Sequence, residues 1–194
     1  MDVSFKNIFK LGLVINPIAG MGGKTGLKGS DGSNTLKKAL SLGAKKESAI
    51  RAEQALLPLK FMINKFSLIT CSAEMGEKSC KKIGLKTDYI IDIDKKITTG
   101  IDTIKAVKIM ARKQVSLILF SGGDGTACDI FYALQDKIPI LGIPAGVKMH
   151  SSVFGTSPNA VGSLVSRIIS NHSDTFPTST AEIMDLDEDM RRYD

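Results

Sequence analysis

The chain has 194 residues, of which 43% are hydrophobic and 24% are charged. This composition suffices for one hydrophobic core, or for one domain and the beginning of another, and it excludes a disordered chain. Lys and Arg outnumber Asp and Glu by 26 to 20, a mild excess that suits an anionic ligand such as a nucleotide. The lysines are scattered and only 6% of the residues are aromatic, so we expect no nucleic acid as a partner.

The sequence carries no pattern typical of export or membrane insertion. It has no run of about 18 apolar residues, and residues 1–16 lack the apolar core and cleavage site of a signal peptide. We therefore expect a cytoplasmic protein without a membrane partner. Cys71, Cys80 and Cys128 form no CxxC pair, and the two histidines have no companions at zinc spacing. Reduced thiols are the prediction for all three cysteines.

Short apolar segments alternate with segments of helical periodicity. Strands are predicted at 10–17, 66–71, 88–93, 115–120 and 138–144. Helices are predicted from Asn34 to just before Pro58, over 73–84, over 101–110 and over 127–134. A last helix begins at Ser157-Pro158, and its expected buried face consists of Ala160, Val161, Leu164, Val165, Ile168 and Ile169. The alternation predicts an α/β fold with a doubly wound, mostly parallel sheet.

Three loops follow predicted strands, after Pro17, after Phe120 and after Pro144. Ligands of such sheets bind beyond the carboxyl ends of the strands. Because parallel strands end at the same edge, we expect the three loops to converge there and to form one ligand site.

The first loop is rich in glycine between residues 20 and 32. Glycine lets backbone amides approach an anion, and lysine adds compensating charge. The loop is not a Walker A motif, because Ile18 stands where that motif needs glycine, and it does not match GxGxxG. It is either a flexible surface loop or a wall that contacts phosphate or ribose; the candidates are Gly20, Gly22, Gly23, Lys24 and Asp31.

The second loop, Gly122-Gly123-Asp124-Gly125-Thr126, follows the fourth predicted strand directly. Its glycines permit a tight turn into a helix with exposed amides, and Thr126 is expected to cap that helix. A carboxylate beside an anion site is explained if Asp124 accepts a proton from a hydroxyl nucleophile or holds a magnesium ion that bridges phosphates. The alternative is a plain Asp-Gly turn.

The third loop begins where Pro144, Ala145 and Gly146 end the fifth predicted strand. Lys148 projects from this connection either toward a phosphate or into solvent. His150 is more typical of a loop residue than of a catalytic base.

Residues 181–194 hold six acidic residues against two arginines, so the rest of the chain carries a net charge of +10. The segment begins with a strand-like alternation of apolar and acidic residues, Ile183, Asp185 and Asp187. A solvated terminal face or a metal-binding role would explain the acids. The strand-like start predicts a first domain over 1–178 and, over 179–194, the start of an incomplete second domain.

The GGDGT motif at 122–126, behind an apolar strand and ahead of a helix, resembles the signature of the NAD kinase and diacylglycerol kinase superfamily, which is distantly similar to phosphofructokinases. The stretches LGLVINPIAGMGGKTGLKGSDG and GIPAGVKMHSSVFGTSP resemble its ATP-NAD kinase-like branch, which is sometimes associated with acetoin catabolism. The resemblance implies a nucleotide-binding kinase domain followed by a β-rich domain, which would be largely missing from these 194 residues. A homo-oligomer is implied if that domain is present.

The implied reaction transfers a phosphoryl group from ATP or polyphosphate, with Mg2+, to the 2'-hydroxyl of NAD. By resemblance, Asp124 accepts the hydroxyl proton, and the nucleotide-binding turn consists of Gly122, Gly123, Gly125 and Thr126. Asn16 and the first loop match the other wall. The resemblance assigns no residues to the metal.

Two departures leave alternatives open. The Asn-Glu pair with which NAD kinases hold adenosine is replaced after GGDGT by Cys128 and Asp129, and lipid kinases also have an acidic residue at the place of Asp129. The acceptor is therefore NAD or another hydroxyl compound, such as a lipid or small metabolite. The early end of the chain leaves a non-catalytic nucleotide-binding domain as a third hypothesis.

Overall fold

The computed structural model describes residues 8–19, 47–62, 64–93, 98–146, 149–171 and 176–184. Within them lie five strands, β1 (Phe9–Ile15), β2 (Phe66–Cys71), β3 (Tyr89–Ile91), β4 (Leu117–Gly122) and β5 (Ile140–Pro144). The α-helices are α2 (Glu47–Leu56), α3 (Glu77–Ile83), α4 (Gly100–Arg112), α5 (Asp124–Leu134) and α6 (Pro158–Ser170), and two short 3-10 helices are η2 (Leu57–Phe61) and η3 (Ala73–Met75). All five predicted strands are present; β3 and β5 are shorter than predicted, β1 ends at Ile15, and β4 covers 117–122 in place of 115–120.

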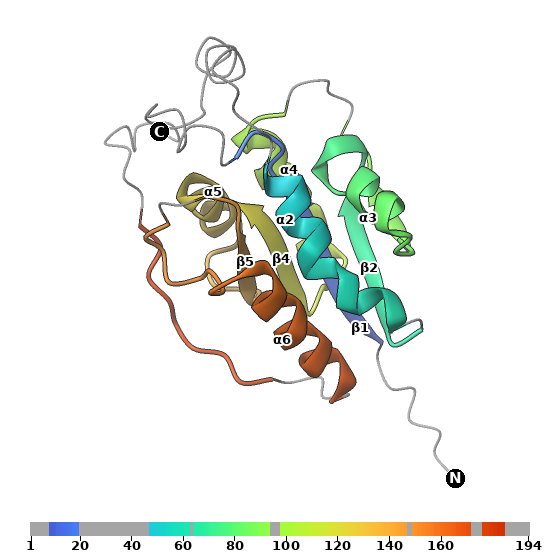
Figure 1. Ribbon diagram of the computed structural model, residues 1–194. Coiled ribbons are helices and arrows are strands. Elements are labelled where there is room, and N and C mark those ends of the chain that lie inside the picture. The colour runs from blue at the N-terminus through green and yellow to red at the C-terminus, as the bar shows by residue number, and fades with distance from the viewer. Residues whose placement is uncertain are drawn as a thin grey trace.

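All five strands are parallel and lie in the order β3-β2-β1-β4-β5. Helices α2, α3 and α6 cover one face of the sheet, and α4 and α5 cover the other (Figure 1). Residues 11–15 of β1 and 117–120 of β4 are buried, as expected of central strands covered on both faces, which explains the continuous apolar runs in these parts of the sequence. The predicted doubly wound α/β fold is therefore confirmed.

Two hydrophobic cores lie on the two faces of the sheet. Alternate residues of β1 divide between them, because successive side chains of a strand point to opposite faces. Leu11 and Leu13 pack in the core under α2 and α6, whereas Val14 packs in the core under α4 and α5. Gly12 also faces α4, and a Cβ there would lie 2.8 Å from the sulfur of Met110. Each face of the sheet thus holds its helices in close contact.

The buried face of α6 differs from the predicted one. Val161, Val165 and Ile169 are buried, Ile168 is half-buried, and Ala160 and Leu164 are exposed. The helix is turned so that Gly162 packs on α2, where a Cβ would collide with the carbonyl oxygen of Ala55. The N-cap prediction is confirmed, since Ser157 Oγ accepts a hydrogen bond of 3.2 Å from the Ala160 amide.

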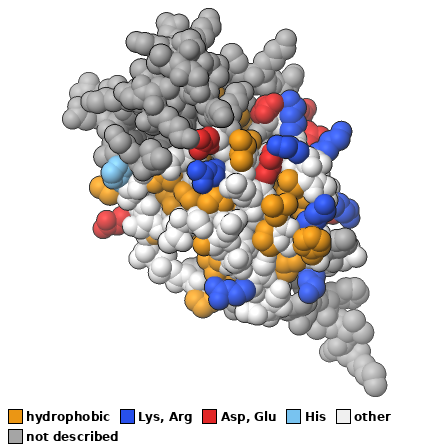
Figure 2. Space-filling model, in the orientation of Figure 1, with side chains coloured by type: hydrophobic (Ala, Val, Ile, Leu, Met, Phe, Trp, Pro, Cys, Tyr) orange, Lys and Arg blue, Asp and Glu red, His pale blue; other side chains and the backbone are white. Residues whose placement is uncertain are grey.

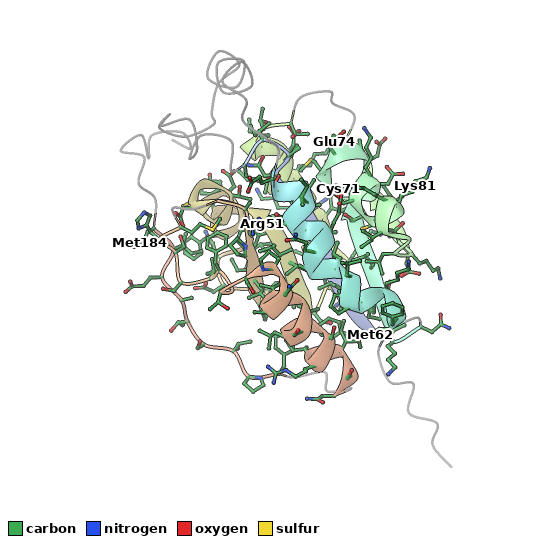
Figure 3. All side chains as sticks on the ribbon, in the orientation of Figure 1. Arg51, Met62, Cys71, Glu74, Lys81 and Met184 are labelled. Carbon is green, nitrogen blue, oxygen red and sulfur yellow. The ribbon has the colours of Figure 1, made fainter. Side chains whose placement is uncertain are left out.

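The described part of the C-terminal segment, residues 176–184, forms no strand. It runs back past the sheet toward α5, where Met184 lies (Figure 1, Figure 3). Hydrogen bonds hold part of it, including one of 2.9 Å from the Ser152 amide to the Glu182 oxygen, and Phe176 and Ile183 pack against the two hydrophobic cores. Asp185 and Asp187, which completed the predicted alternation, lie outside the described residues.

Candidate nucleotide site

The direction of winding reverses between β1 and β4. The chain leaves β1 toward β2 and leaves β4 toward β5, although β1 and β4 are neighbours in the sheet. The two strand ends are joined by a hydrogen bond of 2.9 Å from the Asn16 amide to the Ser121 oxygen. In open α/β sheets the ligand crevice lies beyond the carboxyl ends of the strands at such a point. The loops after β1 and β4 both begin here, as the sequence predicts.

Asn16 ties the end of β1 to its surroundings with both its backbone and its side chain. Its Nδ2 donates to Thr126 Oγ1 at 3.0 Å, and its Oδ1 accepts from the Ile18 amide at 3.1 Å. Its carbonyl oxygen accepts a hydrogen bond of 2.7 Å from Ser48 Oγ at the start of α2. These bonds commit both ends of the side-chain amide to the protein. Asn16 therefore holds the two loops together, and this contact with α5 is its structural role.

The turn after β4 is tighter than predicted. The sequence predicts a helix that begins at Ala127 with Thr126 as its cap, but α5 begins at Asp124 and its N-cap is Gly123. The amides of Thr126 and Ala127 donate to the Gly123 oxygen at 3.0 and 3.1 Å. The Thr126 side chain is 3% exposed and is bonded to Asn16 instead. The cap prediction is wrong because Thr126 lies inside the first turn of α5, where its hydroxyl bonds to Asn16 and not to a backbone amide of the helix.

The three glycines of the turn differ in how closely other residues pack against them. A Cβ at Gly122 would lie 2.5 Å from Thr126 Oγ1 and 2.6 Å from its Cβ, so the fold requires glycine there. At Gly123 and Gly125 no described atom lies within 4 Å of such a Cβ. None of the three has a positive φ, so close approach and not a left-handed backbone explains Gly122. Gly123 and Gly125 leave open the surface around the first helical amides, those of Asp124 and Gly125, which have no intrahelical acceptor.

Asp124 is half-buried at the first position of α5 and bonds to the loop that follows β5. Its Oδ1 accepts a hydrogen bond of 2.9 Å from the Ser151 amide and another of 2.5 Å from Ser151 Oγ. The His150 amide lies 3.0 Å from Oδ2 and 3.3 Å from Oδ1. A carboxylate oxygen has two lone pairs, so Oδ2 retains capacity for another donor. Asp124 joins the second and third loops and keeps one acceptor position open.

The third loop is brought to the same edge. Pro144 ends β5 and pairs with Gly122, Ala145 is buried, and Gly146 is exposed. Ala145 as a whole residue is 1% exposed, so it offers almost no surface to a ligand. The other predicted ligand residues, Gly20, Gly22, Gly23, Lys24, Asp31 and Lys148, lie outside the described residues.

Asp129 of α5 lies beside the N-terminus of α4. A Cβ at Gly100 would lie 2.5 Å from Asp129 Oδ2, so the carboxylate rests against the first residue of α4. Negative charge near a helix N-terminus is stabilising. This position explains the acidic residue without a ligand.

Sequence reasoning did not single out Ser48, Ser121 or Ser151, although all three are buried in the site. Ser121 Oγ donates to the Ser48 oxygen at 2.8 Å, and Ser48 in turn donates to Asn16. The pair of serines at 151–152 in the third loop was visible, but no spacing rule connects either residue to Asp124. Partners distant in sequence identify these residues, and only the fold brings them together.

Metal sites, membrane-spanning helices and reactive thiols each have structural requirements with which the described residues can be compared. They contain no group of three or more His, Cys, Asp or Glu side chains that could hold a metal ion. None of the described helices has the length and apolar character needed to cross a membrane. Cys71 and Cys80 are buried, and burial raises the pKa of each thiol to about 12. On the face shown in Figure 2, hydrophobic groups are interspersed with scattered charges.

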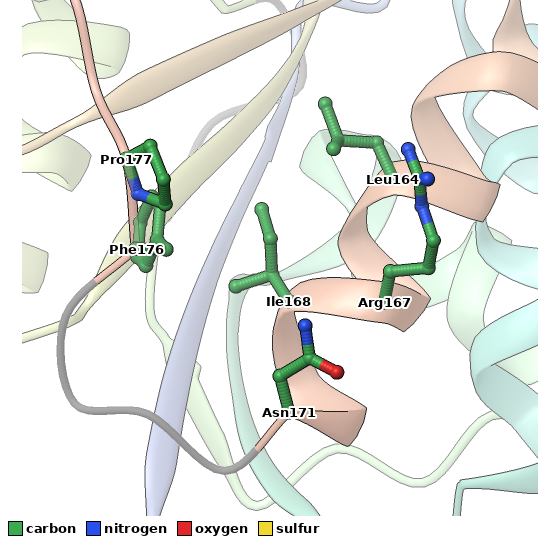
Figure 4. A pocket seen from close by; sticks show the side chains of 6 residues that line it. All are labelled: Leu164, Arg167, Ile168, Asn171, Phe176 and Pro177. Atoms are coloured by element: carbon green, nitrogen blue, oxygen red, sulfur yellow. The ribbon is translucent and has the colours of Figure 1, made fainter.

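A separate pocket of about 220 Å³ lies between α6 and the segment that follows it. Figure 4 shows Leu164 and Ile168 of α6 facing Phe176 and Pro177 across it, with Arg167 as the charged residue. The Phe176 ring centroid is 6.1 Å from that of Phe9, the first residue of β1. The pocket is therefore near the amino end of the sheet, opposite the edge that carries Asp124.

These features define a kinase-like nucleotide-binding α/β domain. A family model described as the ATP-NAD kinase N-terminal domain matches residues 11–173, so the chain belongs to this family, as its motifs indicate. No curated protein matches the chain. Among solved structures it is similar to the UDP-GlcNAc 2-epimerase of Neisseria meningitidis bound to UDP-GlcNAc, at 15% identity and a TM-score of 0.41, over 73% of this chain and 33% of that one. The chain thus spans a third of the length of that epimerase.

Proposed function

We propose that the protein is an NAD kinase-like phosphotransferase that converts NAD to NADP with ATP or polyphosphate as the donor. The observation that carries this proposal is the setting of Asp124, whose Oδ2 retains acceptor capacity beside the open N-terminus of α5. Oriented amides and a helix N-terminus stabilise phosphate groups. A carboxylate at the same point suits a hydroxyl acceptor better than an anion alone. Family membership supports the same chemistry.

In the proposed reaction, the 2'-hydroxyl oxygen of the adenosine ribose attacks the terminal phosphorus of the donor. The new bond joins that oxygen to phosphorus, the bond to the leaving phosphate oxygen breaks, and Asp124 Oδ2 receives the hydroxyl proton. The amides of Asp124 and Gly125 would face the phosphate oxygens, where a small residue at Gly123 leaves them accessible. Positioning and electrostatic stabilisation supply most of the catalysis in phosphoryl transfer.

The described residues do not by themselves form a magnesium site, because Asp124 is a single carboxylate whose Oδ1 is occupied by Ser151. Mg2+ in kinases is commonly bound by one or two carboxylates together with substrate phosphates. We propose that the ion enters with the nucleotide, where it neutralises phosphate charge.

The test measures NADP formed by the purified protein from NAD, ATP or polyphosphate, and Mg2+, using an NADP-specific coupled dehydrogenase. Asp124→Asn removes the proton acceptor and should lower turnover by about a hundredfold to ten-thousandfold. Asp136→Asn is the matched control, since Asp136 is exposed just beyond the other end of α5 with φ of 59°, a backbone that Asn tolerates. Equal NADP production by wild type and Asp124→Asn would refute the role of Asp124.

The acceptor is tested in parallel by following ADP release. Turnover with a lipid or polyol and none with NAD would replace NAD as the acceptor while leaving the kinase site in place. Saturable binding of ATP or NAD without any phosphoryl transfer would instead show a non-catalytic nucleotide-binding domain.

A further inference from the structure

Ser151 connects the Asp124 carboxylate to the C-terminal segment through one hydroxyl group. Its Oγ lies 2.5 Å from Asp124 Oδ1, and the Met184 amide donates to the same Oγ at 3.0 Å. From this chain of contacts we infer that Ser151 is a positioning residue that sets the orientation of Asp124 and couples it to residues 182–184. The inference rests on the proposed function where it concerns catalysis, but the coupling itself does not.

The hydrogen atoms can be assigned from the donors present. A serine hydroxyl has one hydrogen and two lone pairs. Asp124 Oδ1 takes the hydrogen, because a carboxylate accepts only and this contact is the shortest. The Met184 amide then occupies one lone pair of Oγ, and the Met184 oxygen, 3.4 Å away, is a much longer contact. The direction of donation therefore runs from Met184 through Ser151 to Asp124.

Ser151 is held firmly enough to position its partner. It is 6% exposed, and its own amide also donates to Asp124 Oδ1 at 2.9 Å. The residues that follow are fixed on both sides, since the Gly142 amide of β5 donates to the Val153 oxygen at 2.8 Å and the Ser152 amide donates to Glu182. The hydroxyl is thus carried on a stretch of backbone anchored to the sheet and to the returning segment.

This anchoring determines which oxygen of Asp124 meets a substrate. Two donors from Ser151 occupy Oδ1, whereas the donor that the described residues supply to Oδ2 is the His150 amide. Without the Ser151 hydroxyl, the carboxylate would lose its shortest contact and could rotate about χ2, a torsion with broad preferences. Displacement of residues 182–184 would act in the same way, because Met184 shares the hydroxyl.

The kinetic test is a double-mutant cycle with Ser151→Ala and Asp124→Asn. A hydrogen bond to a charged group corresponds to about a tenfold to hundredfold effect, so Ser151→Ala should lower kcat by that factor and leave KM for ATP within about threefold. In the Asp124→Asn background, Ser151→Ala should add less than about twofold, because residues that act through one another are not additive. Ser152→Ala is the matched control, since its side chain is exposed and its structural bond is made by the backbone. Multiplicative effects of the two substitutions on kcat would overturn the positioning role.

The coupling is tested without activity by amide hydrogen exchange. Ser151→Ala removes the acceptor of the Met184 amide, which should exchange about fivefold to tenfold faster, whereas Ser152→Ala should leave it unchanged. Exchange in the strands of the sheet reports whether the variant is folded. Unchanged exchange at Met184 in folded Ser151→Ala would overturn the coupling. If the wild type makes no NADP, the proposed function fails, and the exchange result still decides whether Ser151 links the segment to Asp124.

Discussion

Substitution of Gly122 tests the geometry of the strand-to-helix turn directly. In Gly122→Ala the new Cβ would lie 2.5 Å from Thr126 Oγ1, 2.6 Å from its Cβ and 2.8 Å from its Cγ2. Thr126 cannot easily move, because it is buried in the first turn of α5 and is hydrogen-bonded to Asn16. Overpacking of this kind costs about 1 to 3 kcal/mol. For a domain of this size we expect the Tm to fall by about 2 to 12 °C.

Gly125→Ala, at the second residue of α5, is the contrasting variant. Its Cβ meets no described atom within 4 Å, and Ala is favoured over Gly in a helix by up to about 1 kcal/mol. We expect an unchanged or slightly raised Tm, with weaker nucleotide binding because the methyl group covers the open surface. Thermal unfolding followed by circular dichroism, together with calorimetric titration of ATP, measures both properties. A Gly122→Ala protein as stable as Gly125→Ala would refute the packing argument.

Two further predictions concern the strands and the cysteines. Partial burial acts to raise the pKa of Asp88, but the 2.9 Å hydrogen bond from the Leu68 amide helps to hold it below its usual value. Its contribution to stability is therefore present above the pKa of the unfolded chain and is lost as pH falls through the lower folded value. We expect Asp88→Asn to lower the Tm at pH 7, and the difference from wild type to shrink as the pH of the melts falls through the lowered pKa of folded Asp88; a difference that stays constant into acid would contradict this. Ellman's reagent at pH 8 should modify the half-buried Cys128 first, and Cys71 and Cys80, whose pKa burial raises to about 12, only after unfolding; rapid native labelling of either would disprove their burial.

Much of the fold follows from local sequence. The segment 66–71 is both the predicted and the observed strand, because it is short and mostly apolar and contains the aromatic Phe66 and the β-branched Ile69 and Thr70, which favour strands. The start of α6 is equally local, since Ser157 and Pro158 are adjacent cap and first-turn residues. The local sequence of α6 does not determine which of its faces is buried. The buried face depends on Gly162, which allows contact with the backbone of α2, and no period in the helix sequence reports that contact.

The candidate site was predicted in outline and not in its connections. The GGDGT sequence locates the turn, and the parallel sheet places Asn16 beside it. The N-cap at Gly123 could not be predicted because glycine has no side chain that could accept a capping hydrogen bond. Thr126 has a hydroxyl of the capping type, but that hydroxyl is bonded to Asn16. Ser151 was missed because its partner, Asp124, lies 27 residues away. Such pairs depend on how the loops meet, which local patterns do not specify.

The most direct test of the account is where the nucleotide binds. Backbone amide chemical shifts of the protein, recorded by NMR during titration with ATP and with NAD, report this residue by residue. We predict that the largest changes occur at Gly123 and Gly125, at the open start of α5, and that Arg167 and Phe176, at the opposite pocket, change little. Shifts that gather around Arg167 and Phe176 and leave the two glycines unmoved would contradict the assignment of the site to the ends of β1 and β4.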